Sequence, residues 1–141
     1  MSATSTVVVD AWGLLALLRA ELPAGAIVRR YLRRAAAGNL RLLLGVVNLG
    51  EVFYRVWQTA GEAKAEQALR LIRSYPIEIV PAKEEVAIEA ARLKAKHSVP
   101  YADAFVVALA RLEHASVATG DPDILGLSRA LVKVRRLSRD S

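Results

Sequence analysis

The chain has 141 residues, of which 54% are hydrophobic and 24% charged, a balance that suits a globular protein with a sizeable core and excludes a disordered tail. It has no cysteine, which excludes a disulfide framework, a thiolate metal site and a cysteine nucleophile. The formal net charge of +6 favours polyanionic partners, because Lys and Arg side chains neutralise phosphates. The apolar run over residues 11–18 is too short to cross a bilayer, and no basic residue precedes it. We therefore expect a cytoplasmic protein with no signal peptide and no membrane association.

Apolar periodicity predicts strands and helices that alternate along the chain. In chain order we expect a strand over residues 6–9, a helix over 12–21, a helix from 23 to about 38, a strand over 42–45, helices over 46–60 and 62–74, a strand over 77–80, helices over 82–97 and 100–113, and strands over 116–119 and 132–136. Strands that alternate with helices imply a parallel sheet covered on both faces. The prediction is one α/β domain over residues 1–141, with about five parallel strands and helices on both sides.

The basic residues occur in bunches, whereas several acids stand alone in apolar segments. The bunches are Arg29, Arg30, Arg33 and Arg34; Arg92, Lys94 and Lys96; and Arg135, Arg136 and Arg139. Such bunches either position a nucleic-acid backbone or form solvated helix faces, and both interpretations stay open for residues 29–34.

Two isolated aspartates follow predicted strands directly. Asp10 comes after residues 7–9, and Asp121 comes after residues 117–120. In an open α/β sheet, ligands bind beyond the carboxyl ends of the strands. We expect both carboxylates at that edge, although Asp10 could also cap the next helix and Asp121 could make a turn before Pro122.

Two further acids lie near the starts of predicted helices. Glu51 comes one turn after Asn48, in a helix that follows a strand. Asp103 lies in the first turn of the helix that Pro100 opens, among apolar neighbours, where it could also favour the helix dipole. Each acid could have an ordinary structural role by itself, but four acids at one sheet edge predict a functional site.

Clustered carboxylates repel one another, by roughly 4 kcal/mol for two unit charges about 4 Å apart at an effective dielectric near 20. A bound divalent cation removes this cost, and carboxylate oxygens select Mg²⁺ or Mn²⁺. No histidine accompanies the acids, which argues against zinc; His97 and His114 are interpreted as surface or helix-end residues. We therefore predict a Mg²⁺ or Mn²⁺ site.

Four short segments together resemble the acidic motifs of PIN domains in order, spacing and context. They are Val7-Val8-Val9-Asp10, Asn48-Leu49-Gly50-Glu51, Tyr101-Ala102-Asp103-Ala104 and Ala118-Thr119-Gly120-Asp121. The resemblance covers nearly the whole chain, and the small size is similar to that of VapC toxins. It implies a parallel sheet with surrounding helices and a metal-dependent endoribonuclease of a toxin–antitoxin pair.

The resemblance also assigns roles to residues. Asp10, Glu51, Asp103 and Asp121 would be the catalytic, metal-holding acids. Thr119 would supply a supporting hydroxyl, Asn48 would orient the region of Glu51, and Asp123 would be either a fifth acid or the cap of a short helix after Pro122. In many relatives a small hydroxyl residue follows the first aspartate; here Ala11 and Trp12 follow, which puts the role of that hydroxyl in doubt.

The implied reaction is hydrolysis of an RNA phosphodiester, leaving a 5′-phosphate and a 3′-hydroxyl. The implied partners are the RNA, a VapB-like antitoxin and a second copy in a homodimer. An antitoxin Arg or Lys could enter the acidic pocket, and its helix could bind near Trp12, Tyr54 and Trp57. The alternative for each of these aromatic residues is ordinary core packing.

Other enzyme classes lack their motifs here. A haloacid-dehalogenase-type phosphatase needs a second acid two residues after Asp10, where Trp12 stands, and a receiver domain needs adjacent acids at its first strand. The sequence contains neither a phosphate-binding loop of the GxxxxGK[ST] type nor a Gly-x-Ser-x-Gly elbow. A PIN-like module that binds RNA or protein without cutting, and a nuclease directed at DNA, remain as alternatives.

Overall fold

A computed structural model describes residues 4–139. The elements in chain order are β1 (Ser5–Val9), α1 (Ala11–Leu18), α2 (Ala24–Ala36), β2 (Leu40–Gly45), α3 (Val46–Ala60), α4 (Glu62–Ser74), β3 (Glu78–Val80), α5 (Glu84–Lys96), α6 (Tyr101–Leu112), β4 (Ser116–Thr119), α7 (Pro122–Leu125) and β5 (Val134–Arg136).

The strands form one five-stranded sheet in the order β3-β2-β1-β4-β5, and every neighbouring pair is parallel. Strand β1 lies at the centre, where Val8 is in register with Leu43 on one side and Val117 on the other. A strand enclosed on both faces and both edges is favoured by a run of β-branched apolar residues, and Val7-Val8-Val9 is such a run.

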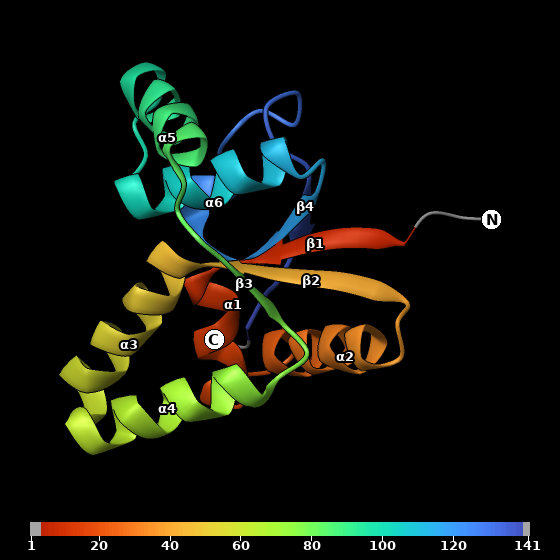
Figure 1. Cartoon of the computed structure of the whole chain (residues 1–141), viewed down its shortest axis with the longest axis vertical. Helices are drawn as coiled ribbons and strands as arrows, with labels where there is room; N and C mark the ends of the chain where they lie inside the picture. The colour runs from red at the N-terminus through yellow and green to blue at the C-terminus, as the bar shows by residue number, and fades with distance from the viewer. Residues whose placement is uncertain (1–3, 140–141) are drawn as a thin grey trace.

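Alternate residues of the central strands face two separate cores. Val7 and Val9 pack into the core beneath α1, α2 and α3, whereas Val8 packs into the core beneath α5 and α6. Figure 1 shows α1 to α4 on one side of the sheet and α5 and α6 on the other. The predicted fold class, a parallel sheet of about five strands with helices on both faces, is confirmed.

The boundaries of several elements differ from the predicted ones. Helix α1 begins directly after Asp10, because the aspartate side chain caps it, and ends at Leu18 instead of residue 21. Strand β2 begins at Leu40, two residues before the predicted start. Strand β5 starts at Val134 instead of residue 132, since the Val132 amide donates to the Ser128 carbonyl at 3.2 Å and not to the neighbouring strand. Gly61, with a φ of +90°, separates α3 from α4 as its place in the sequence predicted.

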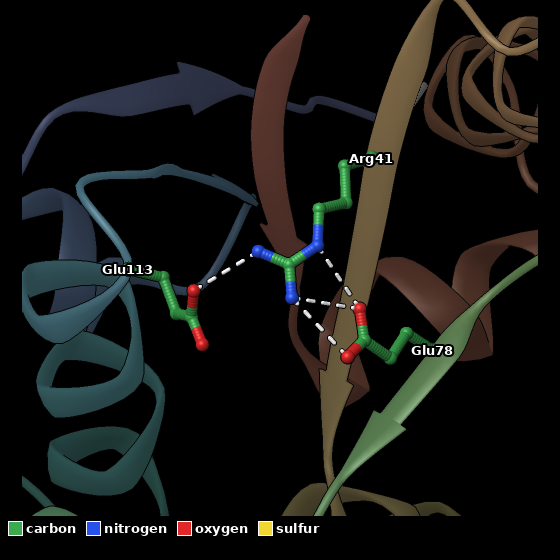
Figure 2. Close-up of polar contacts among 3 residues, drawn as sticks. All are labelled: Arg41, Glu78 and Glu113. Atoms are coloured by element: carbon green, nitrogen blue, oxygen red, sulfur yellow. Dashed lines mark hydrogen bonds and ion pairs between the residues drawn. The ribbon is translucent and has the colours of Figure 1, made fainter.

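A charged network ties the sheet to the end of α6, far along the chain. The guanidinium of Arg41 on β2 contacts Glu78 of β3 at 2.9 Å and Glu113, after α6, at 3.0 Å (Figure 2). All three side chains are partly exposed, so each ion pair contributes about 0–1 kcal/mol. The network orients the elements more than it stabilises them.

The connections that follow β1, β2 and β4 lead straight into α1, α3 and α7. Because the sheet is parallel, these three helix starts gather at its carboxyl edge, where α6 also packs against α3 and α7. Within residues 4–139, no helix combines the length and the hydropathy that a membrane span requires.

Candidate active site

Asp10 ends the central strand and is only 2% exposed. Its Oδ1 accepts a hydrogen bond from the Gly13 amide at 2.9 Å, so it caps α1. Its Oδ2 accepts a hydrogen bond from the Thr119 hydroxyl. The capping alternative is therefore correct, and both carboxylate oxygens are engaged. Asp10 lies outside the group of close carboxylates, although the charges of Asp121 and Glu51 act on it.

Thr119 links the ends of two neighbouring strands. Its side chain is fully buried, and its hydroxyl donates to Asp10 while it accepts from the Asp121 amide at 2.9 Å. One hydroxyl therefore fixes both the side chain of Asp10 and the backbone of Asp121. The supporting role that the sequence resemblance implies for Thr119 stays a prediction.

Asp103 brings a buried charge from α6. It lies in the first turn of that helix and is 5% exposed. Its Oδ2 is buried and has no hydrogen-bond partner within residues 4–139. An ionised oxygen without a partner is costly in the interior, so this atom is a position where a ligand would bind.

Asp121 and Asp123 complete a compact group with Asp103. One carboxylate oxygen from each of the three lies within 4.8 Å of the others. The Asp121 side chain accepts from the Asp123 amide at 2.9 Å and caps α7. The turn proposed for Asp121 is therefore present, whereas the suggestion that Asp123 caps the short helix is wrong. The carboxylate of Asp123 instead lies with the acids.

Asn48 and Glu51 approach from α3. The buried Asn48 amide donates to the Ala102 carbonyl at 3.1 Å and to the Glu51 carboxylate at 3.4 Å. Glu51 also forms an ion pair with Arg55 at 3.2 Å, one helical turn later. Glu51 lies outside the group of three close aspartates, although its charge acts on Asp10 and Asp103. The sequence analysis missed Arg55, which the spacing of four residues could have indicated.

Burial and mutual repulsion raise the pKa values of the two most enclosed acids. Burial raises the pKa of Asp10 to about 7; the hydrogen bonds from Thr119 and Gly13 oppose the shift, and the charges of Asp121 and Glu51 add to it. Burial, followed by the charge of Asp121, also raises the pKa of the Asp103 carboxyl. In the absence of a counterion, the site therefore favours protonated acids.

The donor set suits a hard divalent cation. The compact group offers only carboxylate oxygens, and its most buried member, Asp103, has an Oδ2 without a protein partner in the described chain. Neither histidine belongs to the group: His97 follows α5 and His114 follows α6. Oxygen-only ligands of high charge favour Mg²⁺ or Mn²⁺ over zinc.

The family model for the PIN domain matches residues 7–130. No curated protein sequence matches significantly.

Among solved structures, VapBC2 from Rickettsia felis, bound to a DNA fragment from its promoter, is similar with a TM-score of 0.73 and 11% identity over 94% of this chain and 99% of that one. VapC20 from Mycobacterium tuberculosis, described as a toxin that cleaves the sarcin–ricin loop, has a TM-score of 0.69 and 17% identity over 85% of this chain and 93% of that one. VapBC-5 from the same species has a TM-score of 0.62 and 23% identity over 94% and 99% of the two chains. At these identities the likeness concerns the fold.

The family model spans the strands, the helices and all the acids described above, from Val7 in β1 to the segment that follows α7. The parallel sheet, with carboxylates gathered at its carboxyl edge, agrees with that match. The chain belongs to the PIN domain family.

Proposed function

We propose that the protein is a Mg²⁺- or Mn²⁺-dependent endoribonuclease and the toxin of a toxin–antitoxin pair. The observation that carries the proposal is the group of Asp103, Asp121 and Asp123 in a PIN domain, with one carboxylate oxygen of each within 4.8 Å of the others. Asp103 Oδ2 is also buried without a hydrogen-bond partner among residues 4–139. The VapC20 toxin, which shares the fold, is described as cleaving the sarcin–ricin loop, an RNA element. The net charge of +6 supports a polyanionic substrate.

In this proposal, Asp10, Glu51, Asp103 and Asp121 are the catalytic acids that hold the cation, and Asp123 is a further carboxylate beside them. When bound, a divalent cation supplies a more acidic water and neutralises charge on the phosphoryl oxygens. Because water would be the nucleophile, no ribose 2′-hydroxyl is needed, and the products should carry a 5′-phosphate and a 3′-hydroxyl.

The buried polar residues would hold these acids in place. Thr119 keeps the Asp10 side chain and the Asp121 backbone in a fixed relation. Asn48 connects the start of α6, which carries Asp103, to α3, which carries Glu51. Such preorganisation avoids the cost of ordering charged groups during the reaction.

An antitoxin is the proposed protein partner, in line with the VapBC complexes that share the fold. A groove of about 350 Å³ lies between α1, α3 and α4, with Leu15, Leu18, Val56 and Leu71 among its lining residues. Tyr54 and Trp57 are 47% and 44% exposed, so core packing is the wrong interpretation for both. Trp12 is half-buried against the core. An amphipathic antitoxin helix would cover the groove.

The test is incubation of the purified protein with total RNA in Mg²⁺ or in EDTA, followed by mapping of the cut ends. We expect cleavage only with the metal, and no cleavage by the Asp103→Asn variant. Glu66→Gln removes one negative charge from an exposed site on α4 and is the matched control, expected to cut like the wild type. A single-stranded DNA substrate is run in parallel.

Cleavage that persists in EDTA, or in Asp103→Asn preparations free of contaminating nuclease, would contradict the proposal. Cleavage of DNA but not RNA would show that the substrate is DNA and not RNA. Absence of cutting in the wild type, with intact binding to RNA, would favour a PIN-like binding module.

A further inference from the structure

A cavity of about 220 Å³ opens beside the acids, on the side of α1 and α3. The site carboxylates Glu51 and Asp121 form part of its wall. Three guanidinium groups, from Arg19, Arg55 and Arg139, form another part. Glu21 lines the cavity as well, so three guanidinium groups stand beside three carboxylates there. The arginines come from the C-cap of α1, from α3 and from the segment that follows β5.

The backbone before Arg139 is tied to the site. The amide of Leu137 donates to the Thr119 carbonyl at 2.8 Å, and Leu137 is buried in the core. The carbonyl of Ser138 accepts from the Ala24 amide at 2.9 Å, and Arg139 forms an isolated β-bridge with Pro23. The C-terminal segment therefore delivers Arg139 to the cavity from a fixed position.

The side chain of Arg139 is held by two contacts. Its Nη1 lies 3.2 Å from the Glu21 carboxylate, and its guanidinium carbon lies 5.3 Å from the centroid of the Trp12 ring. Trp12 in turn rests on the loop that carries Asp121: a Cβ added to Gly120 would come within 2.4 Å of the indole. The glycine thus allows the indole to pack closely against the site and to support Arg139.

The three arginines differ in how far they are neutralised. Arg55 pairs with Glu51 and Arg139 pairs with Glu21, so part of the charge of each is already compensated. Arg19 is exposed at the end of α1 and forms no ion pair with any residue between 4 and 139. These arginine contacts add little to the stability of the folded protein. An exposed ion pair contributes about 0–1 kcal/mol, and an exposed cation–π contact contributes about 0.5–1 kcal/mol.

An RNA strand brings more than one phosphate to the site. A phosphate next to the cleaved one would be repelled by the carboxylates unless cations faced it, and guanidinium groups bind phosphate oxygens in a bidentate manner. We propose that this cavity is the subsite for the backbone phosphate adjacent to the cleaved bond, with Arg19 and Arg139 as its ligands and Trp12 as the positioning residue for Arg139. The inference rests on the proposed ribonuclease function and adds to it the residues that set the register of the strand.

The first test measures binding without cleavage. A fluorescein-labelled single-stranded RNA 15-mer is titrated, by fluorescence anisotropy in Mg²⁺, into Asp103→Asn protein with or without Arg139→Gln. We expect Kd to rise about tenfold, the effect of losing one charged hydrogen-bonding contact. The slope of log K against log salt should fall by about 0.7, the value for one phosphate contact on a single strand. Arg19→Gln should act in the same direction.

Arg70→Gln is the matched control, because it removes the same charge from an exposed position on α4, outside the basic bunches. It should leave Kd within about twofold. Equal effects of the Arg70 and Arg139 variants would overturn the subsite. Melting temperatures of all variants establish that each is folded, and Arg139→Lys, which keeps the charge but not the fork, should bind with intermediate affinity.

The role of Trp12 is tested by two replacements. Trp12→Phe keeps an aromatic face under Arg139 and should bind RNA nearly as well as the parent. Trp12→Leu removes that face and should approach the affinity of the Arg139→Gln protein, with no further loss when the two changes are combined. Equal binding by the Phe and Leu variants would show that Trp12 does not position the arginine.

The second test uses an oligonucleotide spanning a mapped cut, with a neutral methylphosphonate at one phosphate at a time. Arg139→Gln should raise KM more than it lowers kcat, and its effect should vanish when one phosphate adjacent to the cut is neutral. An effect that persists with every modified substrate would overturn the subsite while leaving the nuclease intact. If the wild type cuts no RNA, the proposed function fails, and the binding titration still decides the subsite.

Discussion

Among the acids of the site, Asp103 is the side chain whose ionisation is most unfavourable in the folded protein. Its Oδ2 is buried without a partner in the described chain, and the charges of Asp121, Glu51 and Asp10 all act on it. Asp10 differs, because both of its oxygens accept hydrogen bonds, from Gly13 and Thr119. The two acids should therefore respond differently to amide replacement.

Asp103→Asn should raise the melting temperature of the metal-free protein, because the wild type must either keep a buried, repelled charge at this position or take up a proton to remove it. It should also shrink the stabilisation by Mg²⁺, which follows RT ln(1 + [L]/Kd). Thermal melts in EDTA and in a Mg²⁺ series measure both effects. A lower melting temperature in EDTA would assign Asp103 a structural role.

Asp10→Asn is the contrasting variant. The amide oxygen can still accept from Gly13, but the amide nitrogen cannot accept from the Thr119 hydroxyl. We therefore expect less stabilisation than for Asp103→Asn, or a net loss.

The raised pKa values predict an unusual dependence of stability on pH. With a folded-state pKa of about 7 against a model value of 3.8, Asp10 binds a proton more tightly in the folded protein than in the unfolded chain. The stability that this proton confers is complete below about pH 4 and is lost as pH rises through about 7. The raised pKa of Asp103 acts in the same direction.

The metal-free protein should therefore become more stable as pH is lowered from 8 to about 5, as measured by urea unfolding in EDTA. Saturating Mg²⁺ should flatten this profile, because the cation competes with protons for the carboxylates. A metal-free stability that falls steadily on acidification over this range would show that the acids titrate at ordinary values.

At the level of elements, one buried amide joins the two helices that approach the site from opposite faces of the sheet. Asn48 in α3 donates to the Ala102 carbonyl in the first turn of α6 and to Glu51 in its own helix. Helices α3 and α6 otherwise belong to different core clusters. The position of Asp103 relative to Glu51 therefore depends on this side chain.

Asn48→Ala should lower the free energy of unfolding by about 1–3 kcal/mol, since it leaves a carbonyl in a half-buried place without its partner. RNA cleavage should fall as well, because α6 loses its tie to α3. Urea unfolding and initial cleavage rates are the measurements. Asn39→Ala, at an exposed turn, is the control and should change neither. Unchanged activity in a destabilised Asn48 variant would limit Asn48 to a structural role.

At the level of the whole molecule, the two proposed binding regions lie next to each other. The acidic site and its arginine-lined cavity adjoin the apolar groove between α1, α3 and α4. Leu15 and Arg19 line both the cavity and the groove. A partner helix in the groove would therefore reach the acids with a long side chain. Inserted Arg or Lys would pair with the carboxylates in place of the cation.

We expect the small reading frame beside the gene to encode a tight binder that inhibits RNA cleavage. Truncating the inserted Arg or Lys of that binder to Ala should restore cleavage, and at saturating inhibitor, rising Mg²⁺ should relieve inhibition by the intact partner. Cleavage assays at fixed partner and varied Mg²⁺ measure this competition. If the basic residue can be removed with no change in inhibition or in apparent metal affinity, the insertion model is wrong.

The pattern of apolar residues within short segments was sufficient to predict the fold class. The run Val7-Val8-Val9 and the leucines of residues 42–44 are apolar on both faces, as buried parallel strands require, and the segments between strands have helical periodicity. The sequence also placed Asp10 and Asp121 at the carboxyl edge, because each comes within two residues of the end of a strand. These features depend on short-range periodicity, which is fully present in the chain.

Tertiary structure decided how the acids are grouped and what surrounds them. Asp123 joins Asp103 and Asp121 in one group of close carboxylates, whereas Glu51 and Asp10 lie outside it. Glu51 pairs with Arg55, and Asp10 is bound by Gly13 and Thr119. The packing of Trp12 on Gly120 and the arrival of Arg139 from the far end of the chain likewise follow from strand order. Contacts between residues more than a hundred positions apart leave no periodic trace in one sequence, so only the folded chain reveals them.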